Sequence, residues 1–291
     1  MSLKNSNYVL VTPVKDEEEH ISETIDSVVC QTHLPKQWII VSDGSTDRTE
    51  QIVKSAAVNH LFIKLITLPV RATRSFASVV HSTETGVRNI TTEDYRFIGL
   101  LDGDVRFRPD YFSQLIGHFE ANPRLGLAGG MVVDLGDKKN RPPRNLQEVP
   151  GASQFFLRTC FEALGGLLPI PEGGWDALTC ARARMLGYET SLFPELVVEH
   201  LKPRNKAEGG LLKRKWQLGV RDYALGYEPV FEFLKCLSRF LDKPAFIGAL
   251  AWFMGYSWAC LRRPNRIIPE QLLRFIRTEQ RQRLRNALRN E

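Results

Sequence analysis

Two clusters of acidic residues follow apolar, strand-like runs in this sequence. Residues 43–47 (Asp-Gly-Ser-Thr-Asp) follow the run 37–42, and residues 102–104 (Asp-Gly-Asp) follow the run 96–101. Because the carboxyl ends of parallel strands lie at one edge of an open α/β sheet, both clusters are expected to face a single crevice. Carboxylates crowded together repel one another unless a cation lies between them, and a divalent metal carrying a diphosphate meets that need. These residues therefore predict metal-assisted chemistry on a phosphate-bearing substrate.

The elements that would position these clusters alternate between strands and helices. Strands are expected at 8–12, 37–42, 61–66 and 96–101, and helices at about 17–31, 46–57, 74–88 and 109–121. This alternation predicts a mostly parallel sheet with right-handed crossovers. Residues 136–150 are polar, contain prolines and show no period, which indicates a surface loop. From about residue 209 onward the pattern is helical only.

Composition is ordinary for a soluble α/β protein. The 291 residues are 43% hydrophobic and 25% charged, so one large domain with an extension is expected rather than two equal domains. The first residues contain no apolar run suited to a signal peptide. The five cysteines are scattered, odd in number and without CxxC spacing, which favours reduced thiols. A cytoplasmic location is the expectation.

The net charge of +6 is concentrated in the last thirty residues. Residues 262–291 contain nine Arg and three Glu, so the chain before residue 262 is neutral. A nucleic-acid-binding protein more often spreads its basic residues over a recognition face within a recognisable module. The charge distribution therefore argues against a nucleic-acid partner.

Motifs in the first two hundred residues resemble family 2 glycosyltransferases of the GT-A fold. The resemblance rests on the segment 13–17 (Pro-Val-Lys-Asp-Glu) and on the two acidic clusters, which occur in the family's order and spacing. Gly174-Trp175-Asp176 is similar to the catalytic-base segment, and His200 to the late metal-binding histidine. The likeness covers about residues 8–205. It implies a Rossmann-like, mostly parallel central sheet with flanking helices.

The resemblance also implies a division of the chain. Residues 1–207 would form the catalytic domain, with a nucleotide half at about 1–135 and an acceptor half at about 150–207. Residues 208–291 would form a helical extension.

The resemblance assigns a role to each motif residue. Asp104 and His200 would ligate Mg²⁺ or Mn²⁺, while Asp102 would contact the ribose or the metal shell. Asp43 would bind the nucleotide base. The full set of residues expected to bind the nucleotide sugar is Pro13, Asp16, Glu17, Asp43, Arg74, Asp102, Gly103 and Trp175.

Interpretations that give these residues only a structural role stay open. An Asp-Gly-Asp sequence also suits a solvated turn at the end of a strand. Arg71 and Arg74 could pair with a diphosphate or simply begin a surface helix. His200 could be an ordinary core residue.

Asp176 is expected to be the catalytic base. Inversion at an anomeric carbon requires a base that takes the proton from the acceptor hydroxyl, and a carboxylate within hydrogen-bond reach can do this. Trp175 would set an aromatic ring beside the sugar, and Glu172 is the reserve base. The alternative is that Asp176 only caps the helix that follows it.

Residues 245–261 form a run of 17 without charge that contains Trp252, Phe253, Tyr256 and Trp258. The run is short for a membrane span, which needs about 20 apolar residues, and both its flanks are basic. An interfacial or re-entrant helix is favoured over a helix buried against the catalytic domain and over a true span.

The final segment, at about 269–289, predicts a basic amphipathic helix. One face would carry Leu273, Ile276, Gln280, Leu284 and Leu288, with arginines over much of the remainder. Such a helix suits an anionic membrane surface. A solvated helix or an oligomer contact is the alternative.

These features lead to one expected function. The chain would be an inverting, metal-dependent glycosyltransferase that moves a sugar from a nucleotide-sugar donor to a glycan or lipid-linked acceptor. It would lie peripherally at the inner face of the cell membrane, and the one short apolar run favours single addition over processive synthesis. Two alternatives are a sugar-phosphate nucleotidylyltransferase and a non-catalytic, nucleotide-binding membrane adaptor. The first would need a Gly-rich loop after the first strand, where this chain has no glycine.

Overall fold

The computed structural model describes residues 6–70, 76–136, 143, 145–202 and 210–289. The chain divides into two compact units. The first comprises Met1–Pro169 and Trp175–Pro203, and the second comprises Ile170–Gly174 and Arg204–Glu291. The expected domain boundary at residues 207 and 208 lies outside the described residues.

The first unit is an α/β structure whose strands and helices alternate regularly as far as β4. Its elements are β1 (Tyr8–Val14), α1 (Ile21–Val29), β2 (Gln37–Ser42), α2 (Thr49–Asn59), β3 (Ile63–Thr67), α3 (Phe76–Arg88), β4 (Phe97–Leu101), β5 (Val105–Phe107), α4 (Tyr111–Ala121), β6 (Leu125–Asp134), β7 (Ser153–Leu157), α5 (Arg158–Leu164), α6 (Trp175–Met185) and β8 (Glu189–His200).

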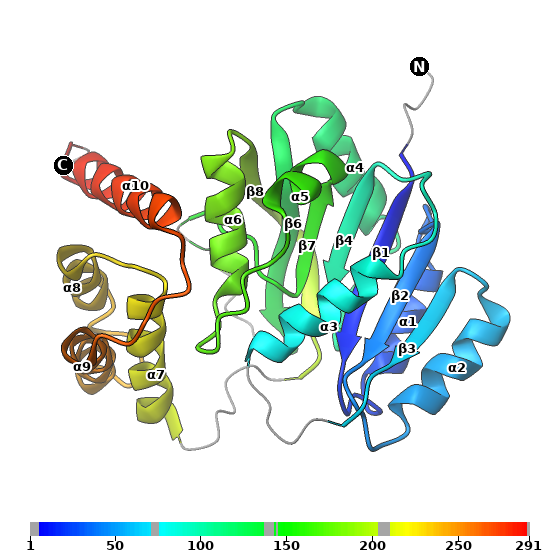
Figure 1. The fold of residues 1–291 in the computed structure, drawn as a ribbon, viewed down its shortest axis with the longest axis horizontal. Coiled ribbons are helices and arrows are strands. Elements are labelled where there is room, and N and C mark those ends of the chain that lie inside the picture. The colour runs from blue at the N-terminus through cyan, green and yellow to red at the C-terminus, as the bar shows by residue number, and fades with distance from the viewer. Residues whose placement is uncertain (1–5, 71–75, 137–142, 144, 203–209, 290–291) are drawn as a thin grey trace. The chain divides into compact units, whose positions relative to one another are not determined.

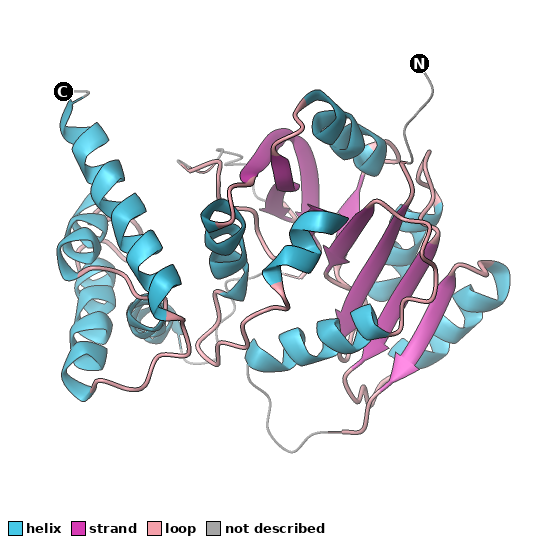
Figure 2. Ribbon diagram, turned by 45° about the horizontal axis from the view of Figure 1, so that its top comes forward, coloured by secondary structure: helices cyan, strands magenta, loops and turns pink. Residues whose placement is uncertain are grey.

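The eight strands form one sheet in the order β3-β2-β1-β4-β7-β6-β8-β5. Strands β1 to β4 run parallel to one another, and β8 runs parallel to β6. β7 is antiparallel to both β4 and β6, and β5 is antiparallel to β8. Figures 1 and 2 show this sheet with helices on both faces. The expected mostly parallel sheet with flanking helices is confirmed.

Alternation along β1 divides the core of the first unit into two layers. Tyr8 and Leu10 pack in a cluster with residues of α1, α2 and α4 on one face of the sheet. Val9 and Val11 pack in a second cluster with residues of α3, α5 and α6 on the other face (Figure 1). This is the pattern of a strand buried on both sides, in which successive side chains point to opposite faces.

The start of the first helix and the presence of one strand differ from what the sequence predicted. The first helix begins at Ile21 and not at about residue 17; before it lies a turn in which the Glu17 carbonyl accepts the N–H groups of His20 and Ile21. β6 has no counterpart among the expected elements. Its sequence, Leu-Gly-Leu-Ala-Gly-Gly-Met-Val-Val-Asp, contains three glycines, which are depleted in strands.

The second unit contains four helices among its described residues: α7 (Gly210–Ala224), α8 (Pro229–Ser238), α9 (Ile247–Arg262) and α10 (Glu270–Arg289). α7 and α9 pack closely because glycines lie at their interface. A Cβ added to Gly219 would lie 2.0 Å from the Trp252 carbonyl oxygen, and one added to Gly255 would lie 2.2 Å from that of Trp216. The expected helical extension is confirmed. Among the described residues, no helix combines the length and apolar character that crossing a bilayer requires.

The apolar face of α10 is used inside the second unit. Leu272, Ile276 and Gln280 are buried, and the Gln280 side-chain oxygen accepts the Glu228 N–H at 3.0 Å. Of the residues expected on one face of this helix, Ile276 and Gln280 are buried, Leu273 and Leu284 are partly exposed, and the side chain of Leu288 is outside those that the structure describes.

Candidate functional site

A cavity of about 170 Å³ opens where β1, β2 and β4 end. Seven of the residues singled out from the sequence line it: Pro13, Glu17, Asp43, Asp102, Gly103, Asp104 and His200. They come from the carboxyl ends of three parallel strands and from the end of β8. The structure thus brings both acidic clusters to one crevice, as the rule for open α/β sheets requires.

The Asp-Gly-Asp turn after β4 is held by a buried threonine of α1. The Thr24 hydroxyl lies 2.9 Å from the carbonyl oxygens of Gly103 and Val105 and 3.0 Å from the Val105 nitrogen. The Asp102 N–H donates to the Ala152 carbonyl at 3.1 Å. These bonds fix the backbone of the turn that carries the two carboxylates before any ligand binds.

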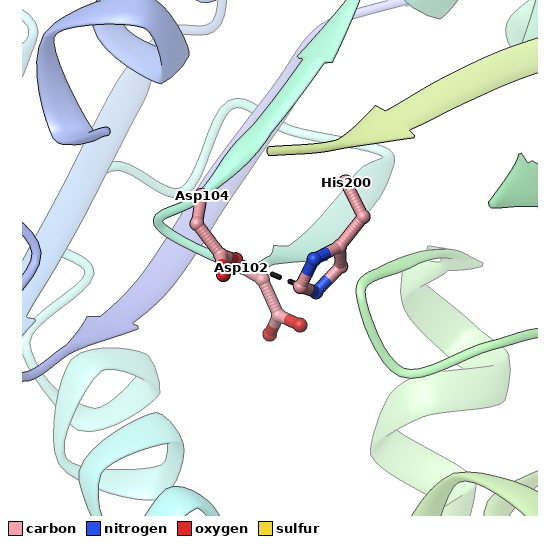
Figure 3. A group of neighbouring side chains, drawn as sticks. All are labelled: Asp102, Asp104 and His200. Atoms are coloured by element: carbon pink, nitrogen blue, oxygen red, sulfur yellow. Dashed lines mark ion pairs between the residues drawn. The ribbon is translucent and has the colours of Figure 1, made fainter. Parts of the chain in front are cut away.

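His200 reaches the same turn through strand pairing. β5 and β8 are antiparallel with Val105 opposite His200, and the Leu201 N–H donates to the Asp104 carbonyl at 2.8 Å. Figure 3 shows the imidazole and the carboxylates of Asp102 and Asp104 converging, with the His200 Nε2 3.6 Å from the Asp104 Oδ1. Asp104 and His200 are both buried.

The second nitrogen of the imidazole decides its tautomer. The His200 Nδ1 lies 2.6 Å from the Lys202 carbonyl oxygen, which can only accept, so Nδ1 carries a proton and donates it. In the neutral ring Nε2 then has a free lone pair. A backbone carbonyl that orients a histidine in this way is the usual arrangement behind a metal-binding imidazole.

The three side chains have the spacing of a metal site. One potential ligand atom from each of Asp102, Asp104 and His200 lies within 4.8 Å of the others. Ligand atoms that share one cation at about 2.1 Å lie at most about 4.2 Å apart, so the three side chains would draw somewhat closer together around a bound ion. Two carboxylates and one neutral imidazole fit Mg²⁺ or Mn²⁺, and the nitrogen ligand suits Mn²⁺ better.

Glu17 adds a further carboxylate to this cavity. Burial raises its pKa, and the negative charge of Asp104 raises it further. Lys202 opposes both effects, because its Nζ donates to the Glu17 Oε1 at 3.1 Å. Crowded acids of this kind have perturbed pKa values, which are common at functional sites.

The loop after β2 is positioned by a lysine that the sequence analysis did not single out. The Lys15 Nζ donates to the carbonyl oxygens of Asp43 and Gly44 at 3.1 and 2.9 Å, and the Asp43 N–H donates to the Val14 carbonyl. Asp16, expected to bind the donor, is not among the residues that line the cavity. Its Oδ1 accepts the Thr46 N–H at 2.8 Å, so its carboxylate ties the two loops together.

α3 supplies a wall of the cavity that the motifs did not indicate. Ser78, Val79 and Ser82 line it, and both serines are buried. They are four residues apart and so lie on one face of the helix, the face that packs on the sheet. The only sequence signal is a stripe of small residues, which by itself indicates close packing.

Asp176 lies at the start of α6 and is not among the residues that line this cavity. Its Oδ2 accepts the Gly151 N–H at 3.2 Å. The neighbouring Ala152 accepts the Asp102 N–H, so the two hydrogen bonds bring the start of α6 next to the end of β4. The carboxylate is partly exposed, and its other oxygen has no role in this contact.

Trp175 is used for packing. Its ring packs against the core cluster on the α3 face of the sheet, and a Cβ added to Gly151 would lie 2.8 Å from it. Trp175 was expected to lie beside the sugar, but it does not line the cavity. Of the remaining expected residues, Arg71 and Arg74 lie outside the described residues, and Glu172 belongs to the second unit.

Comparison with known proteins identifies relatives for most of the chain. A family model described as glycosyl transferase family 2 matches residues 9–167. A poly-beta-1,6-N-acetyl-D-glucosamine synthase of Staphylococcus epidermidis is 25% identical over 252 residues, which are 84% of this chain and 52% of that protein. The synthase of Staphylococcus aureus is 23% identical over the same shares. The chain thus spans about half the length of these curated relatives.

Solved structures with similar folds share less sequence. The mannosyltransferase PcManGT from Pyrobaculum calidifontis, in complex with GDP-Man and Mn²⁺, has a TM-score of 0.59 and 20% identity over 88% of this chain and 73% of that one. S. aureus TarS 1–349 has a TM-score of 0.58 and 12% identity over 89% and 92% of the two chains. The fold expected from the sequence is confirmed by these likenesses.

Proposed function

This chain belongs to glycosyl transferase family 2, and on that premise we propose that it moves a sugar from a nucleotide-sugar donor to an acceptor hydroxyl with inversion at the anomeric carbon. One observation carries the proposal. Asp43, Asp102, Asp104 and His200 converge on a single cavity at the carboxyl edge of the sheet. Such a cavity offers separate partners for a nucleotide base, a ribose and a metal-bound diphosphate.

The donor end of the reaction would be held by the acidic residues of this cavity. Asp104 and His200 would ligate Mg²⁺ or Mn²⁺, and Asp102 would contact the ribose or the metal shell. When bound, the metal would neutralise the charge that develops on the departing diphosphate. Asp43, whose loop is fixed by Lys15, would accept a hydrogen bond from the nucleotide base.

The acceptor end would rely on Asp176. Its Oδ2 is engaged by the Gly151 N–H, which holds the side chain in one orientation and leaves Oδ1 to take the acceptor proton. Because the base and the leaving group would act on opposite sides of the anomeric carbon, a single displacement follows. Glu172 is the competing candidate for this role.

The acceptor is proposed to be a glycan or a lipid-linked sugar in the assembly of a cell-surface polysaccharide. Support comes from the curated relatives, which are named as poly-beta-1,6-N-acetyl-D-glucosamine synthases. UDP-N-acetylglucosamine, the ligand of a structure of S. aureus TarS 1–349, is the first donor to test, and GDP-mannose, the ligand of PcManGT, is the second. A peripheral address at the inner face of the membrane would bring the enzyme to such an acceptor.

The test of this proposal has two stages. Purified protein is incubated with Mn²⁺ and a panel of nucleotide sugars, and the nucleoside diphosphate released is measured. With the active donor identified, Asp176→Asn should leave donor binding nearly intact while transfer falls by about 10²–10⁴-fold. The asparagine can still accept the Gly151 N–H, so the fold around it is kept.

Glu172→Gln is the matched control, since it also neutralises one carboxylate near the same segment. Its turnover should equal that of the wild type. Loss of turnover in Glu172→Gln with normal turnover in Asp176→Asn would transfer the role of base to Glu172. Release of no nucleoside diphosphate from any donor, with metal-independent nucleotide binding, would favour the non-catalytic adaptor.

A further inference from the structure

Exposed hydrophobic side chains are concentrated in one short segment of the second unit. Among the described residues, 23 large hydrophobic side chains are exposed, and 12 of them lie between residues 230 and 261. Single exposed apolar residues need no explanation, but contiguous ones mark an interaction surface. The segment that holds them comprises α8, α9 and the connection between these helices.

α9 is apolar on both of its faces. Gly248, Trp252, Gly255, Tyr256 and Ala259 form its buried face, which packs against α7 within the unit. The opposite face carries an exposed stripe, which consists of Ile247, Leu250, Met254, Trp258 and Leu261. A helix that is hydrophobic all round belongs in a protein core or against lipid. The second face of α9 is therefore open to a partner outside its own unit.

α8 adds a second exposed stripe. Its members are Val230, Phe233, Leu234 and Leu237, which repeat at helical spacing on one side of α8. The two helices lie side by side, because the ring of Phe233 in the α8 stripe is 5.7 Å from the ring of Phe253 in α9. The two stripes, together with the exposed Phe240, Leu241 and Phe246 between them, are called the α8–α9 face below.

The charges around this face are mostly positive. Between residues 229 and 263, five charged side chains are exposed, and four of them are basic: Arg239, Lys243, Arg262 and Arg263, with Asp242 the exception. The basic residues occur at the ends of α8 and α9 and in the connection. Apolar residues bordered by cations match the two layers of an anionic bilayer surface, in which acyl chains lie beneath phosphate headgroups.

We propose that the α8–α9 face is the surface through which this protein docks on anionic membranes. Its apolar side chains would enter the boundary between headgroups and acyl chains, while Lys243, Arg262 and Arg263 would pair with lipid phosphates. α10 would have no inserted residues, since its apolar side chains already pack within the unit. Its exposed arginines would add only long-range attraction. The inference goes beyond the proposed reaction and does not require it.

A second copy of the chain is the competing occupant. A dimer interface would be expected to pair opposite charges around its rim, whereas this rim would bring like charges together. The charge pattern thus favours phosphate over another copy. The two occupants also give opposite results when the apolar side chains are removed.

The experiment measures vesicle binding by co-sedimentation. Neither donor nor acceptor is present, so a failure to bind membranes can be distinguished from a failure of the proposed transfer reaction. Wild-type protein is compared on neutral phosphatidylcholine vesicles and on vesicles containing phosphatidylglycerol. The double variant Ile247→Gln with Leu250→Gln should bind the anionic vesicles at least about tenfold more weakly, because two apolar side chains no longer leave water. Its thermal unfolding should match that of the wild type, since both side chains are exposed.

Matched controls remove similar groups elsewhere. Val58→Gln with Leu61→Gln deletes two exposed apolar side chains of the first unit and should leave binding unchanged. Arg262→Gln with Arg263→Gln should weaken binding to anionic vesicles by about 25-fold and leave neutral vesicles unaffected, at roughly fivefold for each charge. Arg88→Gln with Arg108→Gln, two exposed arginines of the first unit, should have no such effect.

Two results would overturn the proposal. The first is equal binding of the wild type and of Ile247→Gln with Leu250→Gln, or no binding by either. The second is a wild-type dimer in sedimentation velocity that the same double variant dissociates, which would assign the face to a second copy.

Discussion

Replacing Asp104 by asparagine tests the metal site most directly. The change keeps the shape of a buried side chain and removes its charge. Asp104 is one of three side chains whose ligand atoms cluster within 4.8 Å, and it faces the free nitrogen of His200. If these three residues hold the cation, Asp104→Asn removes one of its two carboxylate ligands.

The magnitude follows from the number of ligands. Loss of a group that only orients a metal ligand costs about 10–100-fold in affinity, so loss of a ligand itself should cost at least about 100-fold. That is about 2.7 kcal/mol. Without metal, the Asp104→Asn variant should be more stable than the wild type, because the charge of Asp104 repels that of Glu17 and raises its pKa. Relief of that repulsion should raise the Tm of the metal-free variant above that of the metal-free wild type.

The assay pairs two measurements on one sample. Calorimetry gives the affinity for Mn²⁺ in the presence of UDP or GDP, and thermal unfolding without metal gives the stability. Asp94→Asn is the matched control, since Asp94 is an exposed carboxylate outside the cavity. Mn²⁺ affinity within about threefold of the wild type, together with unchanged or lower metal-free stability, would show that Asp104 is not a ligand.

Two further predictions concern the fold around and beyond the cavity. Gly44 has a φ of 66°, and a Cβ there would lie 2.6 Å from the Val70 Cα, so Gly44→Ala should lower the free energy of unfolding in chemical denaturation by about 2 kcal/mol or more. Gly117→Ala is the control, because its Cβ would meet no atom within 4 Å and should not lower that free energy. Equal losses in the two variants would refute the clash. Burial raises the pKa of Glu232, and the charge of Asp222 raises it further. The stability that protonated Glu232 contributes is therefore fully present below the ordinary pKa of the group and is lost as the pH rises through its raised pKa. Glu232→Gln should therefore unfold with a weaker pH dependence and at a higher temperature near neutral pH, and a pH profile identical to that of the wild type would contradict this reasoning.

Part of the candidate site could be predicted from local sequence. Buried strands appear as apolar runs, and the residues just beyond them must lie at the carboxyl edge of a parallel sheet. That rule is enough to bring Asp43, Asp102 and Asp104 to one cavity. Local reasoning does not indicate that the Asp16 carboxylate ties two loops together or that Trp175 packs against the core cluster, so neither residue lines the cavity. A motif specifies the residue type and not the direction of its side chain.

Other parts of the site depend on contacts between distant segments. Thr24 holds the Asp-Gly-Asp turn from α1, and Ser78 and Ser82 enter the cavity from α3. Neither α1 nor α3 carries a chemical signature at these positions. Periodicity predicts which face of a helix is buried, but many polar groups would suit that face equally well. The sheet on which the helix packs decides which of them reaches the cavity.

The sequence by itself determined the α/β alternation, the acidic residues at the strand ends and the helical character of the last third, because these follow from local patterns of apolar and polar residues. Tertiary structure decided that His200 approaches Asp104 across the pairing of β5 with β8, and that the Lys202 carbonyl selects its tautomer. It also decided that α10 buries its apolar stripe while α9 keeps one exposed. Such outcomes depend on which faces of distant elements meet, and that is fixed only when the whole chain packs.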